Sequence, residues 1–164
     1  MPDTIYVNGN VLLNPSELNE NWKSTLVDHI KKKYINCTKQ YGYITKIVRI
    51  SNKITSQITS DTCYIKINVH FIAEHILPAA GKILECTVNM LFGHGIFAEI
   101  SDKIKILIPI ASLKDYTFDN KLQSFIPNDK KSTKPPISKG DKVKIEISEI
   151  KYEKNRYNCI GNLK

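Results

Sequence analysis

The sequence predicts an α+β half, a helix packed on an antiparallel sheet, followed by an all-β half. The chain has 164 residues, of which 41% are hydrophobic and 24% charged, so it can bury a core. One helical pattern occurs near the N-terminus, and most other apolar segments alternate as strands do. A Pro- and Gly-containing break at residues 77–81 separates the halves, which places the predicted domains at 1–80 and 81–164.

The helix is predicted over residues 15–33. Asn14 is a favourable N-cap, Pro15 suits the first helical position and Glu17 completes a capping box. The lysines at 31–33 fit a solvated helix end that matches the helix dipole, although they also resemble a nucleic-acid patch. The apolar side chains recur every four residues and form one stripe: Leu18, Trp22, Leu26 and Ile30.

The rest of the first half is predicted to form strands. Residues 4–13 are rich in β-forming side chains, and the turn signal Asn8-Gly9-Asn10 is expected to interrupt them. A second strand is expected over residues 41–50. Residues 63–74 alternate between apolar and polar side chains, which predicts a half-buried strand. The apolar face of that strand comprises Ile65, Ile67, Val69, Phe71 and Ala73.

The second half contains five strand-like segments, at residues 82–90, 96–100, 103–108, 142–150 and 156–163. A polar, Lys-rich stretch at 114–140 separates the third from the fourth, and we expect a mobile surface insertion with one short helix there. Short strands with glycine turns and one long connection indicate a small Greek-key barrel of the OB type. Such barrels present a curved face to single-stranded nucleic acid.

The formal net charge of +8 favours a nucleic-acid partner or an acidic protein surface, although solubility alone would also explain it. No apolar run is long enough to cross a membrane, and the N-terminus lacks a secretory signal, so we expect an intracellular protein.

Motifs for metal binding or catalysis are missing from the sequence. The four cysteines, at 37, 63, 86 and 159, form no C-x-x-C pair and are expected to stay reduced. No catalytic motif occurs, and Gly93-His94-Gly95 fits a tight turn better than a phosphate loop because no helix follows it. We therefore expect no metal, no cofactor and no enzymatic activity.

The second half resembles the RNA-binding OB repeat of ribosomal protein S-one. The five strands match in order over residues 81–88, 95–100, 107–113, 140–147 and 159–164. In the first half, the helix and the segments 40–44 and 67–71, leading through Pro78 and Gly81, resemble the stalk-subunit family of RNA polymerases. That family includes the seventh subunit of eukaryotic RNA polymerase II and its archaeal counterpart, and the resemblance covers essentially the whole chain.

The resemblance implies a non-catalytic transcription subunit with an N-terminal tip domain that docks on the polymerase core. A fourth-subunit stalk partner and single-stranded RNA near the barrel are also implied. By motif position, one docking loop holds Tyr41, Gly42 and Tyr43, and a second holds Asp61 and Thr62. The family often has a glycine-containing turn in the second loop, which this chain lacks. Gly42 and Tyr43 also fit a strand-entry turn with a packed aromatic.

In barrels of this class, aromatic residues of the second strand and a basic residue near the fifth strand bind RNA. Phe97 matches one aromatic position and His94 replaces the other, although Phe97 also fits ordinary barrel core. Pro109 stands where these repeats often have histidine, so weak, sequence-tolerant binding is expected. The residues expected to contact phosphates are Lys103, Lys105 and Arg156.

Two other functions fit parts of the sequence. One is a free-standing RNA-binding OB-fold protein of translation-factor type, and the other is a barrel that holds RNA for a nuclease. The second lacks clustered carboxylates and metal ligands. The richness in isoleucine, lysine and asparagine is typical of AT-rich genomes, including those of large DNA viruses. A nuclear location is expected for a cellular protein, and a cytoplasmic or virion location for a viral one.

Overall fold

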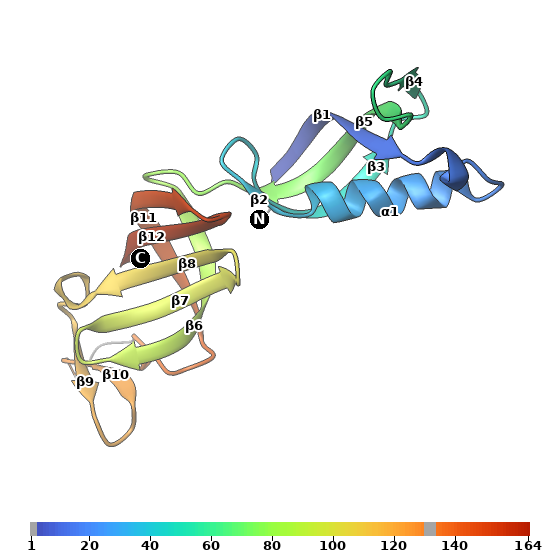
Figure 1. The fold of residues 1–164 in the computed structure, drawn as a ribbon. Coiled ribbons are helices and arrows are strands. Elements are labelled where there is room, and N and C mark those ends of the chain that lie inside the picture. The colour runs from blue at the N-terminus through green and yellow to red at the C-terminus, as the bar shows by residue number, and fades with distance from the viewer. Residues whose placement is uncertain (1–2, 130–133) are drawn as a thin grey trace. The chain divides into compact units, whose positions relative to one another are not determined.

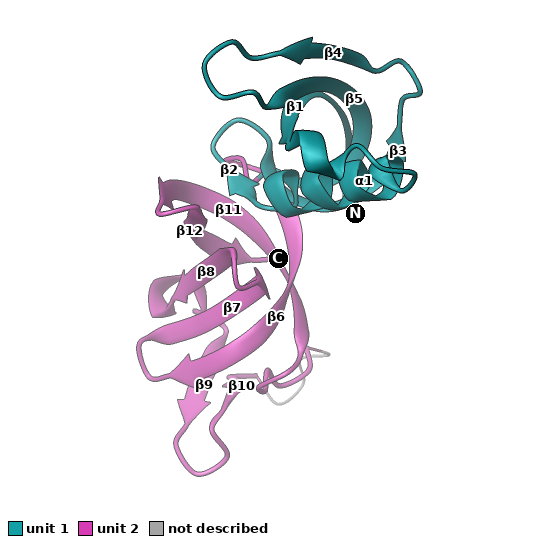
Figure 2. Cartoon of the chain, turned by 45° about the vertical axis from the view of Figure 1, so that its right-hand side comes forward, with its two compact units in different colours: residues 1–77 teal, residues 78–164 magenta. Residues whose placement is uncertain are grey.

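The computed structural model describes residues 3–129 and 134–164, and it is mostly β with one α-helix (Figure 1). Residues 130–133, which belong to the predicted insertion, lie outside the described residues. The chain divides into two compact units, residues 1–77 and 78–164 (Figure 2).

Unit 1 contains a five-stranded antiparallel sheet and the helix α1 (Trp22–Tyr34). The sheet order is β1-β5-β3-β2, and β4 also pairs with β5. The long strand β5 is therefore the centre of the sheet, since it pairs with three other strands. The strands are β1 (Asp3–Leu13), β2 (Cys37–Thr38), β3 (Gly42–Ile50), β4 (Thr55–Ile58) and β5 (Ile65–Ile76).

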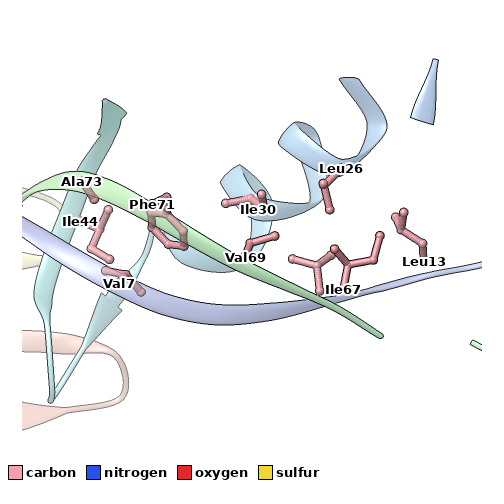
Figure 3. Packing of buried hydrophobic residues seen from close by; sticks show 10 residues of the cluster. Val7, Leu13, Leu26, Ile30, Ile44, Ile67, Val69, Phe71 and Ala73 are labelled. Atoms are coloured by element: carbon pink, nitrogen blue, oxygen red, sulfur yellow. The ribbon is translucent and has the colours of Figure 1, made fainter. Parts of the chain in front are cut away.

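The core of unit 1 lies between α1 and one face of this sheet. The predicted alternation of β5 is confirmed, because its apolar face is buried while His70 on the other face is exposed. Figure 3 shows Ile30 of α1 lying over Val69 of β5 and Leu26 lying over Ile67. One face of the sheet is thus covered by the helix.

The predicted turn at Asn8-Gly9-Asn10 is wrong, because β1 runs without interruption and Gly9 pairs with Val69. Gly9 is required for a close approach instead, since a Cβ atom there would overlap the Tyr34 hydroxyl of α1. That hydroxyl accepts a hydrogen bond from the Asn10 amide at 2.8 Å and donates one to the Asn10 carbonyl at 3.1 Å. The glycine therefore lets the helix end pack directly on the strand.

The predicted continuous helix over 15–33 is also wrong, since a 3-10 turn (Pro15–Glu17) precedes α1. The predicted capping box is present, but it caps the short turn: Glu17 accepts from the Asn14 amide at 2.8 Å. The Asn21 amide donates to the Asn19 side chain at 2.9 Å, a local bond that competes with a continuous helix. Leu18, in this break, is 50% exposed and so does not extend the apolar stripe into the core.

Unit 2 is built on a closed five-stranded barrel in the order β11-β12-β8-β7-β6. All neighbours are antiparallel except β12 and β8, and the order is consistent with the predicted OB-like barrel. Isoleucines at alternate positions of β8 fill the interior. The strands are β6 (Ile83–Phe92), β7 (Gly95–Ser101), β8 (Ile104–Pro109), β11 (Lys142–Glu153) and β12 (Arg156–Leu163).

The described part of the insertion 114–140 differs from the expected mobile segment with a helix. It forms a hairpin of β9 (Tyr116–Asp119) and β10 (Ser124–Pro127), and a 3-10 turn (Ile110–Ser112) precedes it. Phe125 is fully buried and exchanges two backbone hydrogen bonds of 2.9 Å with Ile137, which is also buried. These two apolar residues anchor a segment whose composition is otherwise polar.

The cysteines form no disulfide, and Cys37, Cys86 and Cys159 are buried while Cys63 is exposed. Burial raises the pKa of Cys86 to about 12 and that of Cys159 to about 11. Among the described residues, no group of His, Cys, Asp or Glu side chains could hold a metal ion. No helix within residues 3–129 and 134–164 has the length and apolar character to span a membrane.

Candidate nucleic-acid interface

A shallow groove of about 400 Å³ lies on the outer surface of the barrel, across β7, β8, β12 and β11. Phe97 lies in this groove because its neighbours Ile96 and Ala98 point into the barrel. It is 40% exposed, so it is not part of the barrel core. Its ring and that of Phe92 pack in a T-shaped arrangement with centroids 5.1 Å apart.

Lys105 lines the same groove and brings a cation close to Phe97. On the sheet it is paired with Glu99 of β7 and with Asn158 of β12. An aromatic ring beside an exposed ammonium group is suited to stack a base and contact a phosphate. Of the five residues predicted to bind RNA, this pair is the one brought together in a groove.

The other three predicted RNA-binding residues lie at the two ends of the barrel strands. Lys103, in the β7–β8 turn, forms an ion pair with Asp102 at 3.3 Å, and its carbonyl accepts from the Tyr157 amide next to the exposed Arg156. His94 is exposed in the β6–β7 turn, at the opposite end of β8. The six residues of β8 span about 17 Å, so His94 lies far from Lys103 and Arg156.

Sequence reasoning missed the apolar residues that complete the groove. Leu107 of β8 lies beside Phe97 and is paired in turn with Ile160 of β12, and Ile150 of β11 lines the same groove. Alternation in each strand could have identified the outward positions. The parallel pairing of β8 with β12, which aligns these residues, leaves no local signal in the sequence.

The first predicted docking segment begins β3 and is tightly packed. Gly42 is buried with φ +72°, and a Cβ atom there would overlap the Ile76 carbonyl oxygen and lie 2.8 Å from the Leu77 Cα. The Tyr41 side chain packs against the core, and its carbonyl lies 2.5 Å from His75 Nδ1. The segment therefore has the features of a strand-entry turn with one packed aromatic residue, Tyr41.

The second predicted docking segment, Asp61 and Thr62, is exposed in the loop between β4 and β5. Thr62 Oγ1 lies 2.9 Å from Thr59 Oγ1, and Cys63 has φ +54°, a conformation that favours glycine. This loop precedes β5, whereas Tyr43 pairs with the last residue of that strand. The two predicted docking segments thus lie at opposite ends of a 12-residue strand, up to about 36 Å apart.

The chain is similar in sequence to subunits of RNA polymerase II. No family model matches the chain. The chain is 26% identical over 163 residues to "DNA-directed RNA polymerase II subunit RPB7" of Glycine max. The aligned region covers 98% of this chain and 90% of that protein. The Dictyostelium discoideum subunit of the same name is 25% identical over 131 residues, covering 78% of this chain and 74% of that protein.

Among solved structures, the apo form of Mycoplasma genitalium RNase R matches 50% of this chain and 13% of its own, with 20% identity and a TM-score of 0.38. The two curated relatives, by contrast, match through both units. The chain is therefore similar to RPB7-type RNA polymerase subunits along most of its length.

Proposed function

We propose that this chain is a non-catalytic, stalk-type subunit of a DNA-directed RNA polymerase. In this role unit 1 is the tip domain that docks on the polymerase core, and the barrel contacts nascent single-stranded RNA during transcription. The observation that carries the proposal is the similarity to an RPB7 subunit over 98% of the chain. A match confined to the barrel would have supported only a generic RNA-binding module.

The groove around Phe97 supports the RNA contact. Stacking of a base on an exposed ring is independent of base identity and contributes about 1–3 kcal/mol per base. Lys105 beside the ring would add a phosphate contact that weakens as salt rises. With one aromatic residue and few convergent cations, the barrel would hold a passing transcript weakly and without sequence preference.

The proposed partners are the polymerase core subunits, a fourth-subunit stalk partner and single-stranded RNA. The proposed location follows the polymerase: the nucleus for a cellular enzyme, and the cytoplasm or the virion for a viral one. The proposal assigns no catalytic residue and no cofactor to this chain.

Polymerase association is tested by purification. The tagged full chain is expressed in its native source, and the recovered complex is assayed for promoter-dependent transcription and examined by mass spectrometry. We expect the large catalytic polymerase subunits to be recovered in amounts comparable to the chain. An active polymerase that contains none of this chain would reject the proposal.

RNA contact is tested with the purified full chain and a fluorescent 12-nucleotide oligouridine. Phe97→Ala is expected to weaken binding about 5- to 150-fold, the effect of losing one stacked base. Tyr64→Ala is a matched control, because Tyr64 is also an aromatic residue with 40% exposure but lies in unit 1. Equal effects of both variants would contradict the barrel assignment. RNA binding without any polymerase association would favour the free-standing OB-fold protein.

A further inference from the structure

We propose that the open face of the unit 1 sheet binds a carboxylate-bearing segment of a polymerase core subunit. The binding site is a cleft of about 520 Å³ over β1, β5 and the end of β3, and its basic residues are Arg49, Lys53 and His70. We refer to it as the cationic cleft. The inference rests on the proposed function, and none of the residues predicted to dock lines this cleft.

The register of the sheet brings the residues of the cleft together. Tyr6 of β1 is paired with Ile72 of β5, which is paired with Arg49 of β3. Two residues further along the same pair of strands, Asn8 is paired with His70, and their side chains are joined by a hydrogen bond of 2.6 Å. The residues of β1 and β5 face away from α1, because Val7 and Phe71 between them are buried in the core, and Arg49 lines the same cleft.

The charge of the cleft selects an anionic partner. Arg49 and Lys53 are both exposed, and none of the described residues that line the cleft is Asp or Glu. An approaching carboxylate would therefore meet two permanent cations and no like charge within the cleft. Arginine can bind a carboxylate through two parallel hydrogen bonds, which adds geometric selectivity to the attraction.

The uncharged residues of the cleft favour a protein over RNA. Ile72 is half-buried at the floor, and Tyr6, at 81% exposure, is the most exposed large hydrophobic residue of the described chain. Stacking of successive bases requires successive exposed aromatic rings. The cleft offers one large exposed ring, that of Tyr6, beside the smaller imidazole of His70, since Phe71 is 2% exposed. A tyrosine and an arginine around an apolar floor are, however, typical of protein interfaces.

The cleft lies between the two predicted docking segments, where a partner that contacts both segments could also contact it. Those segments lie at opposite ends of β5, and His70 lies near its middle. Because α1 covers one face of the sheet, the other face offers a direct route to a partner that contacts both ends of β5 (Figure 1). The cationic cleft lies on that route.

The test measures binding of the full chain to polymerase core that has been purified from the native source and stripped of this chain. Arg49→Ser combined with Lys53→Ser removes the two permanent cations. The matched control, Lys31→Ser combined with Lys32→Ser, removes the same charge from exposed positions of α1. We expect the cleft variant to bind core about five- to tenfold more weakly than wild type, and the control to change binding less than about twofold.

Two further measurements separate the possible outcomes. Raising salt from about 0.05 to 0.3 M should weaken wild-type binding and reduce the difference between wild type and the cleft variant. Fluorescence of Trp22, the single tryptophan of the chain, reports whether unit 1 is folded in each variant.

Failure of the wild-type chain to bind core would reject the proposed function together with this inference. Wild-type binding with equal effects of the two double variants would overturn the inference alone. Weaker oligouridine binding by the cleft variant, with unchanged core binding, would also overturn it, because the cleft would then be a nucleic-acid site.

Discussion

Replacing Gly42 with alanine tests whether this predicted docking residue is in fact required for packing. A left-handed backbone conformation costs a residue with a Cβ atom about 1–2 kcal/mol. Gly42 has φ +72°, and the added Cβ atom would overlap the Ile76 carbonyl oxygen, a backbone atom that cannot rotate away. Overpacking of this kind costs about 1–3 kcal/mol. We therefore expect Gly42→Ala to destabilise unit 1 by about 2–5 kcal/mol.

The assay is urea unfolding followed by Trp22 fluorescence, which reports on unit 1 because the chain has a single tryptophan, in α1. Domains are stable by only about 5–15 kcal/mol, so the expected loss would shift the midpoint clearly. Gly81→Ala is the control: Gly81 has φ +80° but no atom within 4 Å of the added Cβ, and it belongs to unit 2. A Gly42→Ala midpoint equal to that of wild type would refute the packing argument.

Three more outcomes follow from single side chains. Cys63→Gly should stabilise unit 1 by about 0.5–1 kcal/mol in the same urea assay, because Cys63 has φ +54°, a conformation that favours glycine. A loss of stability would contradict the inference that this loop is strained. Hydrogen bonds from the Asn14 amide and His29 lower the pKa of Glu17 below its ordinary value of 4.5. The ionised Glu17 carboxylate therefore stabilises unit 1 above pH 4.5, and this stabilisation is lost as pH falls through the lowered pKa. Glu17→Gln should accordingly flatten the acid limb of the curve of stability against pH. A thiol reagent at pH 8 should modify Cys63 rapidly and Cys86 and Cys159 slowly, because burial raises the pKa of the latter two; Cys63→Ser should remove the fast phase.

Elements with a strong local period were predictable from the sequence. The apolar residues of β5 alternate over its buried face, and Leu26 and Ile30 of α1 meet them at helical spacing. The barrel strands were predictable for the same reason where they alternate between the interior and the surface, as β8 does throughout. Phe97 was identified through the resemblance to RNA-binding barrels, but its position beside Leu107 and Lys105 depends on how β7 and β8 pair.

Features that depend on contacts distant in sequence were not predictable. Gly9 resembles a turn residue, and only the position of Tyr34 on α1 explains why a strand needs a glycine there. Phe125 lies in a polar stretch, yet its pairing with Ile137 turns that stretch into an anchored hairpin. The cationic cleft combines residues of β1, β5 and β3, so no single segment carries its pattern.

The last strand of each unit has consequences for a chain that leaves the ribosome N-terminus first. In unit 1, β1, β3 and β4 all pair with β5, the final strand of that unit. In unit 2, β12 lies between β11 and β8 and completes the cylinder. Neither sheet can be completed until its last strand has emerged. During translation β1 and β4 of unit 1 therefore stay unpaired, and so do the edges of β8 and β11 that later pair with β12. The nascent chain passes through two such intervals in which its strand edges are open to aggregation or to chaperones.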